Sequence, residues 1–327
     1  MHIPVSMTST ALGFHCSHEQ HPPEALLRHA QLAAEAGFEH AMCSDHFHPW
    51  SERQSHSGST WSWLGAALAT TPLAFGTVCA PGQRYHPAII AQNVATLARM
   101  NPGRVWLSVG SGEALNEAIT GEPWPDKPAR NARLETAVGI MRALWAGDTV
   151  TADGVVKVHH ARLCDLPPAQ PLIVGAALSQ ETARWMGGWA DALITIAGDR
   201  DDMRAIIDAF RDNGGADKPI FLQVALAFAP SDDEAADAAY DQWRHCALPS
   251  EQLADLPTPA AFDAAADAIT RDEVVGRVRT SSNIDRHLDL LREDAAMGFD
   301  RLYVHNVARE HQERFVDAIA PHLADWR

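Results

Sequence analysis

An acid, an imidazole and an indole stand close together where a short apolar stretch ends, and this combination is suited to proton transfer. The stretch covers residues 40–43, and Asp45, His46 and Trp50 follow it. Histidine titrates near neutral pH and is the most frequent general acid or base in enzymes. We therefore predict that His46 is catalytic and that Trp50 forms an aromatic wall whose π face can stabilise a developing cation. The alternative is a loop histidine that caps a neighbouring helix.

Similar polar groups follow other apolar stretches of the chain. His15 and Ser17 come at the end of the first stretch, where we expect a substrate pocket, and Glu113 and Asn116 follow the fourth. Glu113 is suited to be a second proton-handling group. The small residues at 175–179 precede a predicted helix, whose free amides and dipole favour a phosphate. A phosphate anchor, an acid–base pair and an aromatic wall suit a flat phosphorylated cofactor that carries redox chemistry.

These side chains can act together only if the fold brings the ends of the stretches to one place. Eight strands are predicted, alternating with helices, at residues 11–15, 40–44, 73–80, 104–110, 171–176, 191–197, 220–229 and 301–306. This alternation predicts an α/β fold, a closed TIM barrel whose strands share one carboxyl rim. A doubly wound open sheet is the main alternative, but no Gly-x-Gly-x-x-Gly follows the first strand.

We expect one barrel domain over residues 1–327 with two insertions. Residues 149–166 contain valines on both sides of an Asp-Gly turn, which predicts a β-hairpin outside the main alternation. Residues 247–280, after the seventh strand, begin with a Pro- and Ala-rich stretch and form the second insertion, a candidate lid.

Composition excludes several classes of partner. The net charge of −16 argues against nucleic acid and against an anionic membrane surface. No apolar run is long enough to span a membrane, and Met1 to Thr10 lacks the features of a signal peptide. The five cysteines are scattered, which suits a reducing cytoplasm. We expect a cytoplasmic enzyme that acts on a small molecule.

Four motifs in the same order resemble the deazaflavin-dependent glucose-6-phosphate dehydrogenase group of the bacterial luciferase-like superfamily. They are SDHFHPW at 44–50, RYHPA at 84–88, GSGEALNE at 110–117 and VHN at 304–306. The resemblance covers nearly the whole chain. It implies a TIM barrel with an insertion after the seventh strand, a homodimer, and a bound FMN or coenzyme F420. The implied activity is that of an oxidoreductase that transfers hydride, or of a monooxygenase.

The resemblance also implies roles for single residues. His46 is similar to the family's catalytic imidazole, Trp50 to the aromatic that steadies the transition state, and Glu113 to the proton donor or acceptor. It implies a strained non-proline cis peptide behind the flavin, at 77–78 or 78–79. We expect contacts to the cofactor from Asp45, Thr77, Val78, Cys79, Asn116, Gly175, Ala176, Ala177 and Leu178.

The chain departs from the sugar-phosphate enzymes where those enzymes place lysines. Gly198-Asp199 and residues 257–270 contain no lysine, and a phosphate dianion would face Asp199. We therefore expect that glucose 6-phosphate is not the substrate. A chain so acidic and poor in lysine attracts the polyglutamate tail of F420 less readily, and the motifs look like a subgroup that uses an ordinary flavin. These arguments favour FMN over F420, although Arg53 or Arg184 could reverse the preference.

Two other classes remain open. His46 and His48, with the remaining histidines, could form the zinc site of a metal-dependent hydrolase on a barrel. Against this class, a pair of ligands on the second strand is unusual, and we expect no metal. A flavin-binding protein without catalytic activity is the third class, but it gives no reason for His46 and Glu113.

Overall fold

The computed structural model describes residues 10–326 and shows a closed barrel of parallel strands. Each strand pairs in parallel with the next, and β8 pairs with β9 to close the ring. The barrel strands are β1 (Ala11–Cys16), β2 (His40–Ser44), β3 (Ala74–Cys79), β4 (Val105–Val109), β7 (Leu172–Ala176), β8 (Ala192–Ile196), β9 (Ile220–Phe228) and β11 (Arg301–Asn306). The predicted TIM barrel is confirmed, and the open sheet is excluded.

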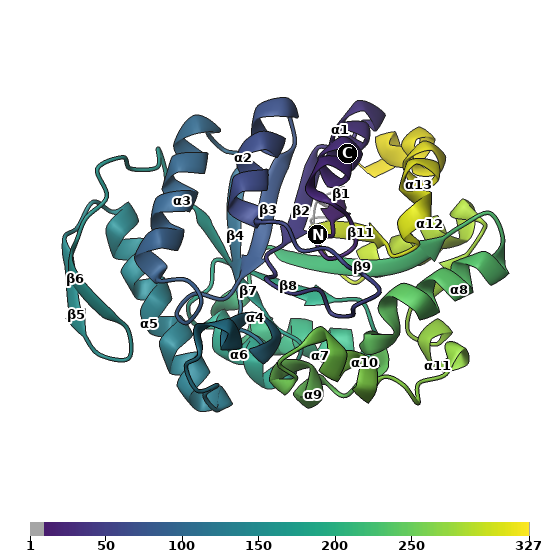
Figure 1. Ribbon diagram of the computed structural model, residues 1–327. Coiled ribbons are helices and arrows are strands. Elements are labelled where there is room, and N and C mark those ends of the chain that lie inside the picture. The colour runs from purple at the N-terminus through teal and green to yellow at the C-terminus, as the bar shows by residue number, and fades with distance from the viewer. Residues whose placement is uncertain (1–9, 327) are drawn as a thin grey trace, which may run out of the picture.

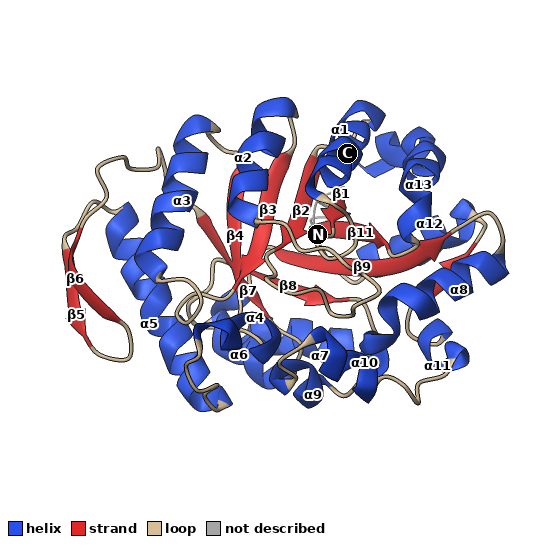
Figure 2. Cartoon of the chain, in the orientation of Figure 1, coloured by secondary structure: helices blue, strands red, loops and turns tan. Residues whose placement is uncertain are grey.

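Helices surround the barrel, as Figures 1 and 2 show. The long ones follow individual strands and bury one apolar side against the sheet. Their bounds are α1 (Pro23–Ala36), α2 (Thr60–Thr70), α3 (Pro87–Met100), α5 (Lys127–Trp145), α6 (Gln180–Gly187), α7 (Arg200–Phe210), α8 (Asp232–Trp243), α12 (Ile284–Ala295) and α13 (Gln312–Ile319). The one-turn helix α4 (Ala114–Glu117) directly follows the loop after β4.

Two segments stand outside the regular alternation. Strands β5 (Val150–Asp153) and β6 (Lys157–Ala161) pair as an antiparallel hairpin, which lies at the left edge of Figure 1. After α8 the chain forms a 3₁₀ turn (Arg244–Ala247) and three short helices, α9 (Ser250–Asp255), α10 (Pro259–Ala265) and α11 (Arg271–Val275). Strand β10 (Arg279–Ser281) then pairs with β9 outside the barrel. This strand was not predicted, because three residues that are largely polar carry no apolar alternation.

Large rings fill the inside of the barrel at half height. Trp106, Phe221 and Tyr303 pack there with ring centroids 5.5–6.0 Å apart. A Cβ on Gly76 would lie 1.9 Å from the Trp106 ring, and one on Gly13 would lie 2.4 Å from the Tyr303 ring. These two glycines therefore make the room that the rings need.

One expectation is wrong. The resemblance implied a cis peptide at 77–78 or 78–79, but within residues 10–326 all peptide bonds are trans.

The five cysteines are free, and three of them are buried as small apolar side chains. Among the described residues, none of the helices combines the length and apolarity that a membrane span requires. The expectation that no signal peptide is present concerns residues 1–10. Residues 1–9 lie outside the part of the chain that the structure describes.

Candidate active site

The imidazole of His46 faces a buried carboxylate at the carboxyl rim of the barrel. Its Nδ1 lies 3.5 Å from Oε1 of Glu19, which is in the loop after β1. Burial lowers the pKa of His46, although the negative charge of Glu19 opposes this shift. His46 is therefore neutral near pH 7, and the carboxylate favours the tautomer with the proton on Nδ1. Its Nε2 is then the nitrogen that carries no proton.

Two serines hold Glu19 in its ionised form. The hydroxyls of Ser17 and Ser44 each donate to Glu19 Oε2 at 2.7 Å. Burial works to raise the pKa of Glu19, but positive charge on His46 and these hydrogen bonds outweigh it and lower the pKa to about 2. Sequence reasoning missed Glu19. It placed Ser17 in the substrate pocket, whereas the Ser17 side chain supports the carboxylate.

Glu113 carries a proton at neutral pH. It lies at the N-terminus of α4, and burial, together with the negative charges of Glu19 and Glu117, raises its pKa to about 8. A carboxylic acid with such a pKa can donate or accept a proton in the physiological range. The electrostatic influence of Glu19 on Glu113 places the two carboxyl groups in the same region of the rim.

Asn116 joins the loop after β2 to α4. Its Oδ1 accepts hydrogen bonds from the backbone amides of Phe47 at 2.9 Å and His48 at 3.4 Å. Its Nδ2 lies 3.5 Å from Glu113 Oε2. Asn116 was expected to contact the cofactor ring, and in the structure its Oδ1 holds the loop that carries His46.

Asp45, another expected cofactor contact, belongs to a buried ion cluster. Arg84 places Nη2 3.2 Å from Asp45 Oδ2 and Nε 3.5 Å from Glu117 Oε1, and all three side chains are almost fully buried. Burial raises the pKa of Asp45 to about 6, against the opposing effect of Arg84. The cluster ties the loops after β2 and β3 to α4.

Trp50 is held between the catalytic loop and the insertion after β9. Its ring centroid is 4.9 Å from that of His46, and the ring stacks on His245 at 5.1 Å with an interplanar angle of 9°. The edge of Phe262, on α10, meets it at 5.2 Å. Sequence reasoning missed His245 and Phe262, because nothing local in the insertion indicates which of its side chains turn towards the rim.

The ends of β3, β7 and β8 also carry apolar side chains. Val78 and Ala176 pack on the inner cluster, whereas Cys79 belongs to the outer layer between strands and helices. Leu178 and Ile196 are 52% and 50% exposed on neighbouring strand ends. Apolar side chains of this kind suit a flat ring, and Cys79 is not among those that pack on the inner cluster.

The turn at 175–179, predicted to hold a phosphate, leads into the N-terminus of α6. Ser179 caps α6, since its hydroxyl accepts from the Thr182 amide at 3.3 Å. We expected a glycine at position 175 because it lets the backbone approach a phosphate. The structure gives another reason, since a Cβ at this position would lie 2.6 Å from Met186 Sδ. The absence of a side chain therefore lets α6 pack on β7.

Among residues 10–326, the other histidines do not gather into a metal site. His48 Nδ1 lies 3.0 Å from the Leu115 carbonyl, and His86 Nδ1 accepts from the Ala88 amide. Within residues 10–326, no three His, Cys, Asp or Glu side chains converge in a way that could hold a metal ion. The hydrolase alternative therefore lacks a ligand set in the described part of the chain. His15 lies on the same rim, with its ring 4.5 Å from that of His305.

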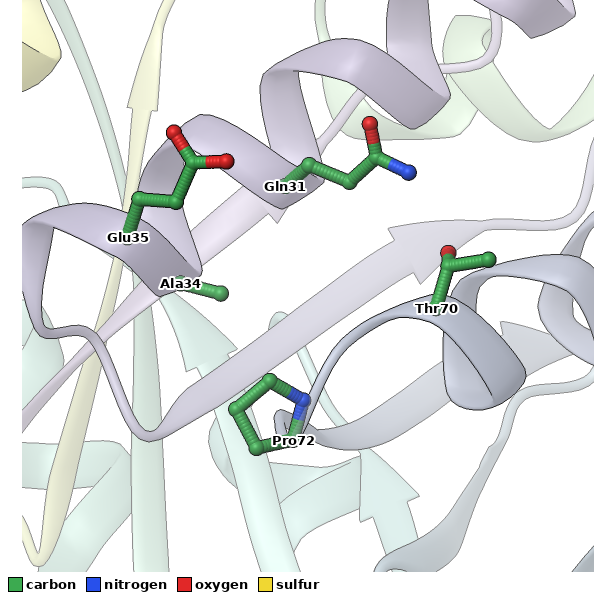
Figure 3. A pocket seen from close by; sticks show the side chains of 5 residues that line it. All are labelled: Gln31, Ala34, Glu35, Thr70 and Pro72. Atoms are coloured by element: carbon green, nitrogen blue, oxygen red, sulfur yellow. The ribbon is translucent and has the colours of Figure 1, made fainter.

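A hollow of about 460 Å³ lies at the other end of the barrel. Figure 3 shows its wall, formed by Gln31, Ala34 and Glu35 of α1, by Thr70 at the end of α2 and by Pro72 after it. These residues precede β2 and β3, and the amino ends of barrel strands contribute to stability rather than to catalysis. We do not assign this hollow to the active site.

A closed parallel barrel with proton-handling groups on its carboxyl rim defines a barrel enzyme, and comparison with known proteins gives the family. The family model described as luciferase-like monooxygenase matches residues 5–304, and the chain belongs to this family. The predicted superfamily is thereby confirmed.

Curated relatives are F420-dependent glucose-6-phosphate dehydrogenases. The protein from Beutenbergia cavernae is 33% identical over 326 residues, covering 95% of this chain and 97% of that protein. The protein from Mycobacterium tuberculosis is 32% identical over 331 residues, covering 97% and 98%.

Among solved structures, an F420-dependent secondary alcohol dehydrogenase in complex with an F420–acetone adduct has a TM-score of 0.88 at 27% identity, covering 98% of this chain and 99% of that one. An F420-dependent tetrahydromethanopterin reductase from Methanopyrus kandleri has a TM-score of 0.75 at 16% identity, covering 96% and 99%, and shows the fold alone. The chain is thus a flavin- or deazaflavin-dependent oxidoreductase of the luciferase-like family.

Proposed function

We propose that the chain exchanges hydride between coenzyme F420 and a small uncharged substrate. The observation that carries the proposal is the buried pair of His46 and Glu19 on the same rim as a protonated Glu113. The apolar side chains of Val78, Ala176 and Ile196 on the same rim suit the ring of such a cofactor. When bound, the deazaflavin supplies the carbon that accepts or gives up hydride.

The side chains of the rim then handle the two protons of the reaction. In the direction of oxidation, His46 accepts the hydroxyl proton of the substrate at Nε2. Glu19 remains ionised and stabilises the imidazolium that forms, as the carboxylate of a catalytic triad does. Glu113 holds the second proton, which its raised pKa makes available near neutral pH.

Comparison with the relatives changes our choice between FMN and F420. The acidic composition favoured FMN, but relatives that are 32–34% identical over almost their whole length are named for F420. We therefore propose F420 as the physiological cofactor and FMN as the competitor to be tested.

The charges of the rim support the proposal that glucose 6-phosphate is not the substrate, although close relatives are named for it. Arg84 is enclosed by Asp45 and Glu117, and Arg53 pairs with Asp263 at 2.7 Å. These guanidinium groups are already neutralised. Asp199 caps α7 with its carboxylate and offers no positive charge.

The proposal is tested by cofactor titration and by the His46→Ala variant. F420 is expected to bind more tightly than FMN by fluorescence titration, and mass spectrometry should find it in protein purified from a host that makes it. His46→Ala should keep the affinity for F420 and lose about 10²- to 10⁴-fold in turnover. Unchanged turnover would refute the role of His46, and tighter binding of FMN would refute the cofactor. Oxygen uptake with reduced FMN and a substrate would indicate a monooxygenase instead.

A further inference from the structure

Six rings form a continuous row at the rim, which we call the ring belt. Successive centroids are between 4.5 and 5.1 Å apart in the order His15, His305, Trp243, His245, Trp50, His46. The proposed chemistry uses only the last two. Three imidazoles on the β1–β11 side of the belt are therefore left without a role.

Strand alternation directs two of these imidazoles into the barrel mouth. Tyr303 belongs to the inner cluster, and Gly13 faces the ring of Tyr303 from β1. Side chains two positions further along a strand point to the same face. His15 and His305 therefore lie inside the barrel, one layer above Tyr303, where the rim is formed.

Hydrogen bonds of Gln20 fix the tautomer of His305. Gln20 Nε2 donates to the Val307 carbonyl oxygen at 3.0 Å and to Gln242 Oε1 at 3.1 Å. Both amide hydrogens are thus used, and Gln20 Oε1, 2.7 Å from His305 Nε2, is an acceptor. His305 therefore carries its proton on Nε2, and its Nδ1 is a bare acceptor.

The acceptor of His305 has no partner. Nδ1 of His305 is buried without a hydrogen bond, as are Nδ1 of His15 and Nδ1 of His245. Leaving a buried polar atom unpaired costs about 1–3 kcal/mol, so buried polar atoms are nearly always satisfied by protein, water or ligand. Three such atoms on neighbouring rings give this part of the belt hydrogen-bonding capacity that a polar ligand would satisfy.

The imidazoles on this side of the rim are uncharged. Burial lowers the pKa of His15 to about 4 and that of His245 to about 3, and it also lowers the pKa of His305. The three imidazoles are therefore neutral at pH 7. They offer hydrogen-bonding atoms but no positive charge that would favour a phosphate or a carboxylate.

We propose that His305, flanked by His15 and His245, binds a hydroxyl group of the substrate, and that the substrate is an uncharged diol or polyol. One hydroxyl reacts: its carbon gives hydride to the deazaflavin, its proton passes to His46, and a carbonyl group forms. A second hydroxyl donates its hydrogen to Nδ1 of His305. The inference rests on the proposed function, whose cofactor binding is measured separately.

The test compares two alcohols that differ by one hydroxyl, in wild type and in a variant without the acceptor. With F420 as oxidant, kcat/KM for butane-2,3-diol should exceed that for butan-2-ol by about 3- to 10-fold, which corresponds to one neutral hydrogen bond. His305→Phe keeps an aromatic ring and should abolish this preference while the affinity for F420 is unchanged. His305→Gln retains an acceptor and should restore part of it. His159→Phe, which removes an exposed imidazole on β6, is the matched control.

The outcomes are separable. If wild type and His305→Phe prefer the diol equally, the inference is overturned. It is also overturned if wild type binds F420 but neither binds nor oxidises either alcohol. Faster oxidation of glucose 6-phosphate than of the diol also overturns it. If His305→Phe does not fold, His305→Leu, which also removes the acceptor, takes its place. A diol preference in His305→Leu equal to that of His159→Phe then overturns the inference in the same way. Loss of F420 binding by wild type would instead refute the proposed function.

Discussion

The imidazole of His46 reaches across the rim to a carboxylate that is 27 residues earlier in the chain, with Nδ1 3.5 Å from Oε1 of Glu19. The carboxylate is held by the hydroxyls of Ser17 and Ser44, at the ends of β1 and β2. In the proposed mechanism this arrangement favours a proton on Nδ1 of His46, because the acid stays ionised over the whole physiological pH range. It also means that Glu19 acts through His46, as a positioning residue.

Removing the charge of Glu19 should therefore change both rate and pH dependence. Glu19→Gln is expected to lower kcat by roughly 10²-fold, since the imidazolium loses its counter-charge. Glu19 raises the pKa of His46, so the acidic limb of the kcat profile should move to lower pH in the variant. Steady-state kinetics between pH 5 and 9 measure both effects. Glu35→Gln, at an exposed position of α1, is the control, and an unshifted acidic limb would contradict the positioning role.

Glu113 should set the alkaline limit of activity. Its pKa is raised to about 8, so the proton that it donates is present below that pH and is lost as the pH rises through it. We expect kcat to fall above about pH 8 in wild type, in line with the behaviour of an essential acid. In Glu113→Gln the remaining activity should be low and should show no such decline. A variant that keeps the same alkaline limb would show that another group titrates there.

The buried cluster of Asp45, Arg84 and Glu117 should be sensitive to loss of its cation. Arg84→Met leaves two buried carboxylates without a partner and is expected to lower the free energy of unfolding by about 3–5 kcal/mol. Arg142→Met removes a half-exposed partner of Asp191 and should cost about 0–1 kcal/mol. Urea unfolding of both variants measures the difference. Equal stability losses would mean that the cluster does not hold the loops of the rim.

The barrel interior should not tolerate a methyl group on Gly76. Gly76→Ala directs its Cβ into the Trp106 ring and is expected to destabilise the protein by about 1–3 kcal/mol or more. At Gly65, within α2, a Cβ would meet no atom within 4 Å, so Gly65→Ala should stabilise by about 0.5–1 kcal/mol. Thermal melts of the pair test the assignment. A Gly76→Ala variant as stable as Gly65→Ala would contradict the described packing.

Much of the fold was encoded in local patterns. Strands β2 and β11 were predicted with the bounds that the structure shows, because each is an apolar run ended by polar residues. The order of strands and helices then required a parallel barrel, and a barrel brings the strand ends of His46 and Glu113 to one rim. The predicted positions at Thr77 and Cys79 lie on β3 as expected, but periodicity alone could not show that Cys79 packs in the outer layer.

The sequence by itself thus determined the family, the barrel and the rim on which chemistry takes place, since these depend on apolar periodicity and short motifs. Only the tertiary structure decided the partners of each polar group. Glu19 meets His46, Arg84 meets Asp45, and His245 meets Trp50 from an insertion nearly two hundred residues away. Protonation and hydrogen bonding depend on burial and on distances of a few ångströms between such groups, and these quantities exist only once the chain has folded.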